Sequence, residues 1–171
     1  MLTIVLGLGL MFGALLLLVK KAEGGVSGSP TLTPIPTPAP STDTIGNMIS
    51  YSAAKYGVSS NLVRAVAMTE SSLNPNATNP NDPSYGLMGI MPILAEDFGI
   101  VKDWHNPTAA EIAMIRDPQT NLNIGAWHLA RLLKQYSFDV AIQMYNVGVT
   151  GYNEGARAES YLKKVKGYLN G

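Results

Sequence analysis

The chain has 171 residues, which is enough for one domain of ordinary size with short accessory segments. Its 12 basic residues (Lys and Arg) balance its 12 acidic ones, and no basic stripe stands out, so we expect no nucleic-acid partner. The absence of cysteine excludes disulfides and thiolate metal sites. The two histidines, His105 and His128, lie far apart without ligand-like neighbours, so no metal site is expected.

An uncharged apolar run of 18 residues, Leu2 to Val19, opens the chain. As a helix it would be about 27 Å long, close to the ~30 Å hydrocarbon core of a bilayer. The basic pair Lys20 and Lys21 follows the run, whereas a signal peptide carries its basic residues in front. We therefore predict an uncleaved transmembrane helix over residues 1–21, with a cleaved signal peptide or a buried core helix as alternatives. Two lysines are too few to fix its orientation.

Residues 22–43 form a predicted linker. Five prolines, from Pro30 to Pro40, alternate with Thr and Ser after a glycine-rich start. Such a segment has little apolar surface to bury, and it is expected to be extended and partly stiff. Its expected role is to hold a domain away from a membrane, and the alternative is a ligand for a proline-recognising module.

Residues 44–171 are predicted to form one nearly all-helical domain. Apolar residues at helical spacing indicate a first helix from Ile45 to Tyr56, ended by Gly57. Ser59 or Ser60 would cap a second helix that ends near Glu70 to Ser72. A polar loop with three prolines follows, and a short helix is expected after Pro92.

Four features predict the remaining helices. Thr108 and Glu111 form a capping-box pattern, and a long amphipathic helix is expected over Asn121 to Tyr136. Ser137 would cap the next helix, with chain breaks at Gly148 and Gly151. A last helix is predicted from Ala156 to Leu169. No strand-type alternation is evident, and a two-stranded excursion at Ser84 to Ile90 is left open, so the fold class is all-α with little or no sheet.

Glu70 is the candidate catalytic residue. It ends an apolar helix just before a long polar loop. A carboxyl group on the wall of a partly apolar cleft has a raised pKa, and the negative end of the helix dipole raises it further. Such a group can stay protonated near neutral pH and donate a proton. By position alone, however, Glu70 is better explained as an exposed residue in the last turn of a helix.

Five segments follow one another over almost the whole of Thr44 to Leu169. They are ESSLNPNA from Glu70, GLMGIMP from Gly86, NLNIGAWHLARLL from Asn121, AIQMYNVG from Ala141 and YLKKV from Tyr161. No single segment is specific alone, but in this order and spacing they resemble the lytic transglycosylase family, lysozyme-like enzymes related to goose-type lysozymes. The resemblance implies a compact lysozyme-like helical domain.

The resemblance also implies roles for individual residues. Glu70 would be the catalytic acid and base, and the hydroxyl of Ser71 would support the local structure. Tyr161 would lean toward the catalytic carboxyl. The residues expected to line the cleft and contact sugar are Asn79, Gly86, Leu87, Met88, Met91, Tyr145 and Asn146.

Two positions depart from the family pattern. The family commonly has a glutamine where this chain has Gly89, so a side-chain contact to substrate is lost and the backbone can approach more closely. It often has a Ser-Pro pair where this chain has Asn79 and Pro80. Asparagine still donates and accepts hydrogen bonds, so binding is expected to persist with altered detail.

The implied reaction cuts peptidoglycan glycan strands between N-acetylmuramic acid and N-acetylglucosamine. Glu70 alone would act as acid and then as base, leaving a 1,6-anhydro end, without metal or organic cofactor. One alternative is a hydrolytic muramidase that uses Asp82 as a second carboxylate, although Asp82 is more simply explained as a solvated turn residue. Another is a catalytically idle sugar-binding or structural protein of a phage particle or secretion channel. The predicted anchor suits an enzyme that opens the wall locally for such an assembly.

Overall fold

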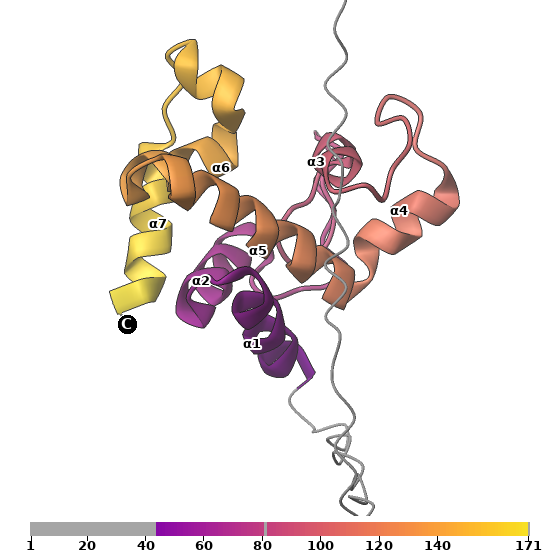
Figure 1. Ribbon diagram of the computed structural model, residues 1–171, viewed down its shortest axis with the longest axis horizontal. Helices are drawn as coiled ribbons and strands as arrows, with labels where there is room; N and C mark the ends of the chain where they lie inside the picture. Colours follow the sequence, from indigo (N-terminus) through magenta and orange to yellow (C-terminus); the bar gives the residue numbers. More distant parts are fainter. Residues whose placement is uncertain (1–43, 81, 171) are drawn as a thin grey trace, which may run out of the picture. The chain divides into compact units, whose positions relative to one another are not determined.

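The computed structural model describes residues 44–80 and 82–170, which form seven helices and their connecting loops (Figure 1). The predicted transmembrane helix and linker concern residues 1–43 and lie outside the described residues. Within the described ranges, no helix is both long enough and apolar enough to span a bilayer. The all-α fold class is confirmed.

The first two helices follow the predicted boundaries closely. α1 (Thr44–Tyr56) ends before Gly57, whose φ of 68° is accessible to glycine at little cost. α2 (Ser60–Ser71) begins after Ser59, which has an extended backbone but makes no side-chain capping hydrogen bond. The helix therefore owes its start to the burial of its apolar face, which contributes Leu62, Val63 and Val66 to the core.

Two short helices follow a long loop. α3 (Pro92–Asp97) has a proline in its first turn, where the missing amide costs nothing. α4 (Ala109–Arg116) begins with the predicted capping box: the Thr108 hydroxyl accepts from the Glu111 amide at 3.2 Å, and the Thr108 amide donates to Glu111 at 2.8 Å. This local pattern fixes the start of α4 without help from distant residues.

The last three helices differ from the prediction at their ends. α5 (Pro118–Gln135) begins at Pro118 rather than Asn121, because the Asp117 carboxylate caps it by accepting from the Thr120 amide at 2.9 Å. α6 (Phe138–Asn153) is kinked at Gly148, which has a φ of 74°, as expected. The predicted break at Gly151 is wrong, because the helix continues to Asn153. α7 (Glu159–Asn170) starts at Glu159 rather than Ala156.

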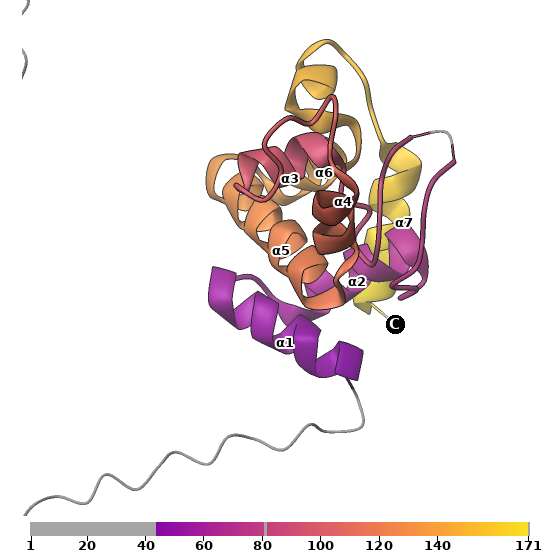
Figure 2. The ribbon, with the colours of Figure 1, turned by 90° about the vertical axis from the view of Figure 1, so that its right-hand side faces the viewer.

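α5 lies at the centre of the domain and packs against α1, α2, α4 and α6 (Figure 1). Leu122, Ile124 and Leu129 on this helix are fully buried. α2 and α7, which are far apart in sequence, lie side by side in both orientations (Figure 2). This pairing brings the end of α2 next to the last of the described helices.

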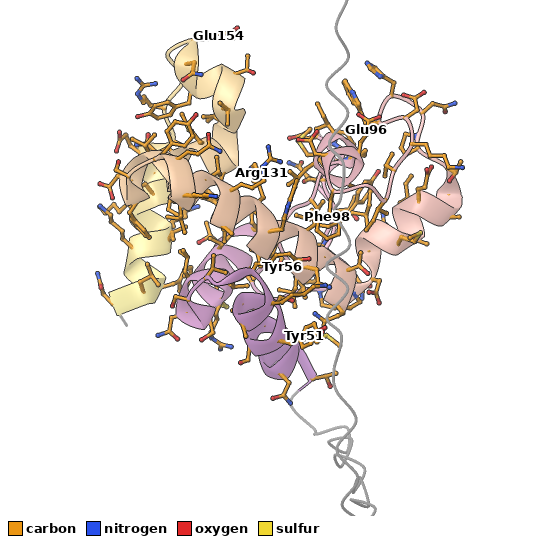
Figure 3. The ribbon with its side chains drawn as sticks, in the orientation of Figure 1. Tyr51, Tyr56, Glu96, Phe98, Arg131 and Glu154 are labelled. Carbon is orange, nitrogen blue, oxygen red and sulfur yellow. The ribbon has the colours of Figure 1, made fainter. Side chains whose placement is uncertain are left out.

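A row of aromatic rings joins α1, the end of α3 and α5, and Figure 3 labels two of its members, Tyr56 and Phe98. The ring of Phe98 meets Tyr56 at 6.4 Å and Trp127 at 5.3 Å, both edge to face. The guanidinium of Arg131 lies 4.5 Å from the Trp127 ring centre and 3.6 Å from the Asp97 carboxylate. These contacts fix the short helix α3 against the longer α1 and α5.

The loop between α2 and α3 contains no extended strand among its described residues. Thr78 pairs with Tyr85, and Tyr85 pairs with Ile90, each as an isolated antiparallel bridge. The two-stranded segment that the sequence left open at Ser84 to Ile90 is therefore not formed, and the described residues there make only these isolated bridges. They fold the loop back so that Gly86 to Ile90 lies close to the end of α2.

Candidate active site

Glu70 occupies the last turn of α2 and is partly buried. The two residues beyond the helix, Ser72 and Leu73, have φ values of 54° and 62°, in the left-handed region that non-glycine residues seldom adopt. Their amides donate to the carbonyls of Met68 and Ala67 at 3.1 and 3.4 Å. Strained backbone of this kind persists where the surrounding structure imposes it, and it clusters at functional sites.

Tyr161 on α7 holds one oxygen of the Glu70 carboxyl group. Its hydroxyl donates to Glu70 Oε1 at 2.6 Å across a separation of 91 residues. The Tyr161 side chain is 9% exposed, so this hydrogen bond is largely shielded from water. A second tyrosine, Tyr145 on α6, donates to the carbonyl of Met88 at 3.0 Å and thereby ties α6 to the turn beside Glu70.

Burial raises the pKa of Glu70, and the hydrogen bond from Tyr161 opposes this rise only in part. Burial, together with the negative charge of Glu70, raises the pKa of Tyr161 and of Tyr145. Both phenols therefore keep their protons at neutral pH and act as donors. The environment thus favours a neutral carboxyl group held by a neutral phenol, which is a combination suited to general acid chemistry.

Gly89 lies directly against the carboxyl group of Glu70. Its φ is 60°, and a Cβ atom added there would lie 2.5 Å from Glu70 Oε2. The turn that carries it is closed by paired backbone hydrogen bonds between Tyr85 and Ile90, at 2.9 and 3.0 Å. Two independent requirements, backbone conformation and space, therefore favour glycine at this position.

Asn121 organises the same turn from the first part of α5. Its side chain is fully buried, and its oxygen accepts from the Met88 amide at 2.8 Å. Its amide group donates to the carbonyls of Tyr85 and Ile115 at 2.7 and 2.9 Å. The sequence motif includes Asn121, but its role as the internal support of the turn was not predicted and depends on a contact between distant segments.

Leu87 and Met88, which were predicted to line the cleft, are core residues. Both are 0% exposed, main chain included, and neither lines the cavity beside Glu70, so their contact with substrate stays a prediction. The hydroxyl of Ser71 lies 2.8 Å from the Leu87 carbonyl and 3.0 Å from that of Ala67. Ser71 thus joins the end of α2 to the turn, in line with the structural role that the resemblance implies.

A cavity of about 320 Å³ opens beside Glu70. Among the described residues that line it, Glu70 is the sole carboxylate. Asp82 is exposed and is absent from this lining, which agrees with a solvated turn residue. The other lining residues are Ala77, Thr78, Asn79, Pro80, Ser84, Gly86 and Gly89.

Besides Leu87 and Met88, three predicted sugar contacts lie outside the lining of this cavity. Met91 is partly buried at the N-cap of α3, and Asn146 is exposed on α6 before its kink. Tyr145 is occupied with the Met88 carbonyl. Their roles toward substrate remain predictions.

His128 on α5 is partly buried, and the sequence named it only in excluding a metal site. Its ring packs against Tyr145 with centres 5.4 Å apart, and its Nδ1 has no hydrogen-bond partner among the described residues. Burial, assisted by the positive charge of Arg131, lowers the pKa of His128 to about 4, while Asp97 opposes the shift. In the described part of the chain, no three His, Asp or Glu residues gather as a metal site.

Comparisons with known proteins place this arrangement in context. Residues 47–168 match the family model described as Transglycosylase SLT domain. A transglycosylase of Enterobacteria phage PRD1 is 32% identical over 123 residues, covering 71% of this chain and 42% of the relative. A membrane-bound lytic murein transglycosylase C of Serratia proteamaculans is 32% identical over 134 residues, covering 72% of this chain and 36% of the relative. The chain thus spans less than half the length of either relative.

Two solved structures share the fold. The lytic transglycosylase Slt of Pseudomonas aeruginosa, an inactive mutant, superposes with a TM-score of 0.57 at 20% identity, covering 72% of this chain and 23% of the other. The 70 kDa soluble lytic transglycosylase of Escherichia coli gives a TM-score of 0.51 at 24% identity, covering 72% and 22%. At these identities the likeness concerns the fold alone.

Proposed function

Because this chain belongs to the Transglycosylase SLT domain family, we propose that it cuts peptidoglycan glycan strands without consuming water, with Glu70 as its acid and base. The observation that carries the proposal is the state of Glu70. It is the one carboxylate among the described residues that line the cavity, its pKa is raised by burial, and Tyr161 fixes its orientation.

In the first step, protonated Glu70 gives its proton to the oxygen of the β-1,4 bond between N-acetylmuramic acid and N-acetylglucosamine. The bond between that oxygen and the anomeric carbon breaks, and its electron pair stays with the leaving oxygen. The neighbouring acetamido group of the sugar stabilises the positive charge that develops. A raised pKa supports this step because it increases the fraction of Glu70 that carries a proton near neutral pH.

In the second step, the C6 hydroxyl of the same muramic acid attacks the anomeric carbon, and its proton passes to the Glu70 carboxylate. A 1,6-anhydro ring closes, Glu70 regains its proton, and no water is consumed. An internal nucleophile has a high effective molarity, so a site with one carboxylate suffices. A hydrolytic enzyme would use a second carboxylate to activate water, and Asp82 is not among the described residues that line the cavity.

The experiment that tests this function is a digestion of purified peptidoglycan with the full chain in isotopically labelled water. We expect mass spectrometry to find anhydromuramic ends without label. Reducing ends that carry the label would support the hydrolytic alternative, and an absence of released fragments would support an idle structural protein.

Three variants sharpen this test. Glu70→Gln keeps the shape of the side chain and removes the transferable proton, and we expect a rate at least about a thousandfold lower, as for loss of an essential acid. Asp82→Asn should retain full activity, whereas the hydrolytic alternative requires a loss. Glu154→Gln is a matched control, because this carboxylate is exposed at the end of α6 (Figure 3).

We further propose that residues 2–19 tether the enzyme to a membrane, where it opens the wall locally for a phage or secretion assembly. The apolar run, the proline-rich stretch that follows it and the membrane-bound and phage origins of the named relatives support this proposal. Flotation with lipid vesicles should carry the full chain to the lipid layer. A chain without residues 2–19 should stay in the aqueous fraction, and equal flotation of both would contradict the tether.

A further inference from the structure

The two oxygens of the Glu70 carboxyl group have different surroundings. Oε1 accepts a short hydrogen bond from Tyr161 at 2.6 Å. Oε2 lies against the Cα of Gly89, where an added Cβ would come to 2.5 Å. Gly89 also lines the cavity, so the Oε2 side of the carboxyl group is the side with space for another molecule.

We propose that Gly89 is a positioning residue that reserves Glu70 Oε2 for proton transfer. This inference rests on the proposed function of Glu70 and assigns the reacting atom within it. Tyr161 occupies Oε1, and the missing side chain at position 89 lets the carboxyl group lie flat against the turn with Oε2 toward the cavity. The proton that leaves for the glycosidic oxygen departs from Oε2, and the proton of the C6 hydroxyl returns to the same atom.

A side chain at position 89 of this chain would disturb this arrangement, so relatives with glutamine there are expected to hold the turn farther from the catalytic carboxyl group. A Cβ atom 2.5 Å from Oε2 is well inside van der Waals contact, so the carboxyl group would have to rotate or withdraw. Rotation would weaken the hydrogen bond from Tyr161, because that bond holds the other oxygen of the same carboxyl group. The turn itself has little freedom to yield, because Tyr85 pairs with Ile90 and Asn121 holds the Met88 amide.

Other glycines of the chain provide matched controls for backbone strain. Gly57 has a φ of 68°, close to the 60° of Gly89, but an added Cβ at Gly57 meets nothing within 4 Å. Gly57→Ala therefore carries a similar conformational cost without touching the carboxyl group. Gly89→Asn adds the same Cβ with a side chain that tolerates the left-handed region, so it separates the steric effect from backbone strain.

The experiment measures anhydromuramic product formation by the full-length wild type, Gly89→Ala, Gly89→Asn and Gly57→Ala. We expect both variants at position 89 to lose about a hundredfold or more in kcat, as for misplacement of a reacting group. Gly57→Ala should stay within about threefold of the wild type, and its melting temperature should fall about as far as that of Gly89→Ala. Activity of Gly89→Asn within threefold of the wild type would overturn the inference and leave the proposed function intact.

A second measurement does not depend on turnover. Titration of the Glu70 carboxyl group by carbon NMR should show a higher pKa in Gly89→Ala than in the wild type, because the hydrogen bond from Tyr161 favours the charged form and would be weakened. Gly57→Ala should leave this pKa unchanged. If the pKa of Glu70 were the same in Gly89→Ala and in the wild type, the role of Gly89 would be refuted. This outcome is independent of the proposed function, which would be refuted if the wild type released no product.

Discussion

The carboxyl group of Glu70 is placed where its charged form is unfavourable. Burial removes water from around it, and the single hydrogen bond from Tyr161 replaces only part of the lost hydration. A site of this kind gains a proton donor at the expense of folding stability at neutral pH. Such a conflict between activity and stability is common where a reacting group is held in a partly apolar place.

We therefore predict that Glu70→Gln stabilises the protein at pH 7. The folded state binds the Glu70 proton more tightly than the unfolded state, so stability falls as the pH rises above the unfolded pKa of 4.5. The uncharged glutamine has no such dependence. Its melting temperature should exceed that of the wild type by a few degrees at pH 7, and the two should converge below about pH 4.

The control for this prediction is Glu154→Gln, which removes an exposed carboxylate. Its melting temperature should follow that of the wild type at every pH. If Glu70→Gln were less stable than the wild type at pH 7, burial would not be the dominant influence on Glu70.

At the scale of elements, the position of Tyr161 beside Glu70 depends on the connection between α6 and α7. α7 begins at Glu159, and the Ala158 amide just before it donates to Gln143 Oε1 on α6 at 3.1 Å. Gln143 is 5% exposed, so this hydrogen bond is protected from water. Gln143 on α6 thus satisfies the amide that precedes α7, and it ties the start of the helix that carries Tyr161 to α6.

Gln143→Met should lower the free energy of unfolding by about 1 to 3 kcal/mol, because it leaves the buried Ala158 amide without an acceptor while nearly preserving volume. Chemical denaturation measures this change. Gln135→Met on the exposed face of α5 is the matched control and should change the stability by less than about 0.5 kcal/mol. Equal effects of the two substitutions would show that the contact with Ala158 is unimportant.

The helix boundaries also show how much of the fold could be predicted from the sequence alone. The capping box of Thr108 and Glu111 and the stop at Gly57 are local signals, and the structure has them as predicted. The predicted start of α5 at Asn121 is too late, because the apolar spacing begins there. The helix-start signal of Asp117 and Pro118 is equally local and marks the true start. α6 continues past Gly151, where Tyr152 packs against the cluster of Leu132, Ala141 and Met144, a contact between distant residues that helical spacing does not encode.

The candidate site was less accessible to prediction than the helices. Glu70, Ser71 and Tyr161 were named through a family resemblance, since no spacing brings residues together across 91 positions. Three features of the site arise between segments that are distant along the chain. They are the support from Asn121, the steric requirement at Gly89 and the surroundings of the His128 Nδ1, which has no hydrogen-bond partner among the described residues. Contacts of this kind require the fold.

For the whole molecule, the pH dependence of stability combines groups with opposite effects. Glu70 stabilises the fold as the pH falls, whereas His128 does the reverse. The folded pKa of His128 is about 4 against an ordinary 6.5, so the unfolded chain binds its proton more readily. The resulting stability is present above about pH 6.5 and is lost as the pH falls toward 4.

We predict that His128→Phe reduces the acid sensitivity of the fold. It removes a titrating group with an unpartnered nitrogen and keeps a ring against Tyr145. Between pH 7 and pH 4.5 the variant should lose about 1 to 3 kcal/mol less unfolding free energy than the wild type, measured by denaturation at both pH values. An identical pH dependence in the two proteins would exclude His128 as a source of acid sensitivity.

The hydrogen bond between Tyr161 and Glu70 also has a consequence during biosynthesis. The ribosome makes Glu70 well before Tyr161, because α7 follows the other described helices along the chain. A nascent chain that lacks α7 therefore carries the acid without the phenol that orients it. The proposed wall-cutting activity would thus be withheld until α7 has been made, which would protect the cell from partly made copies.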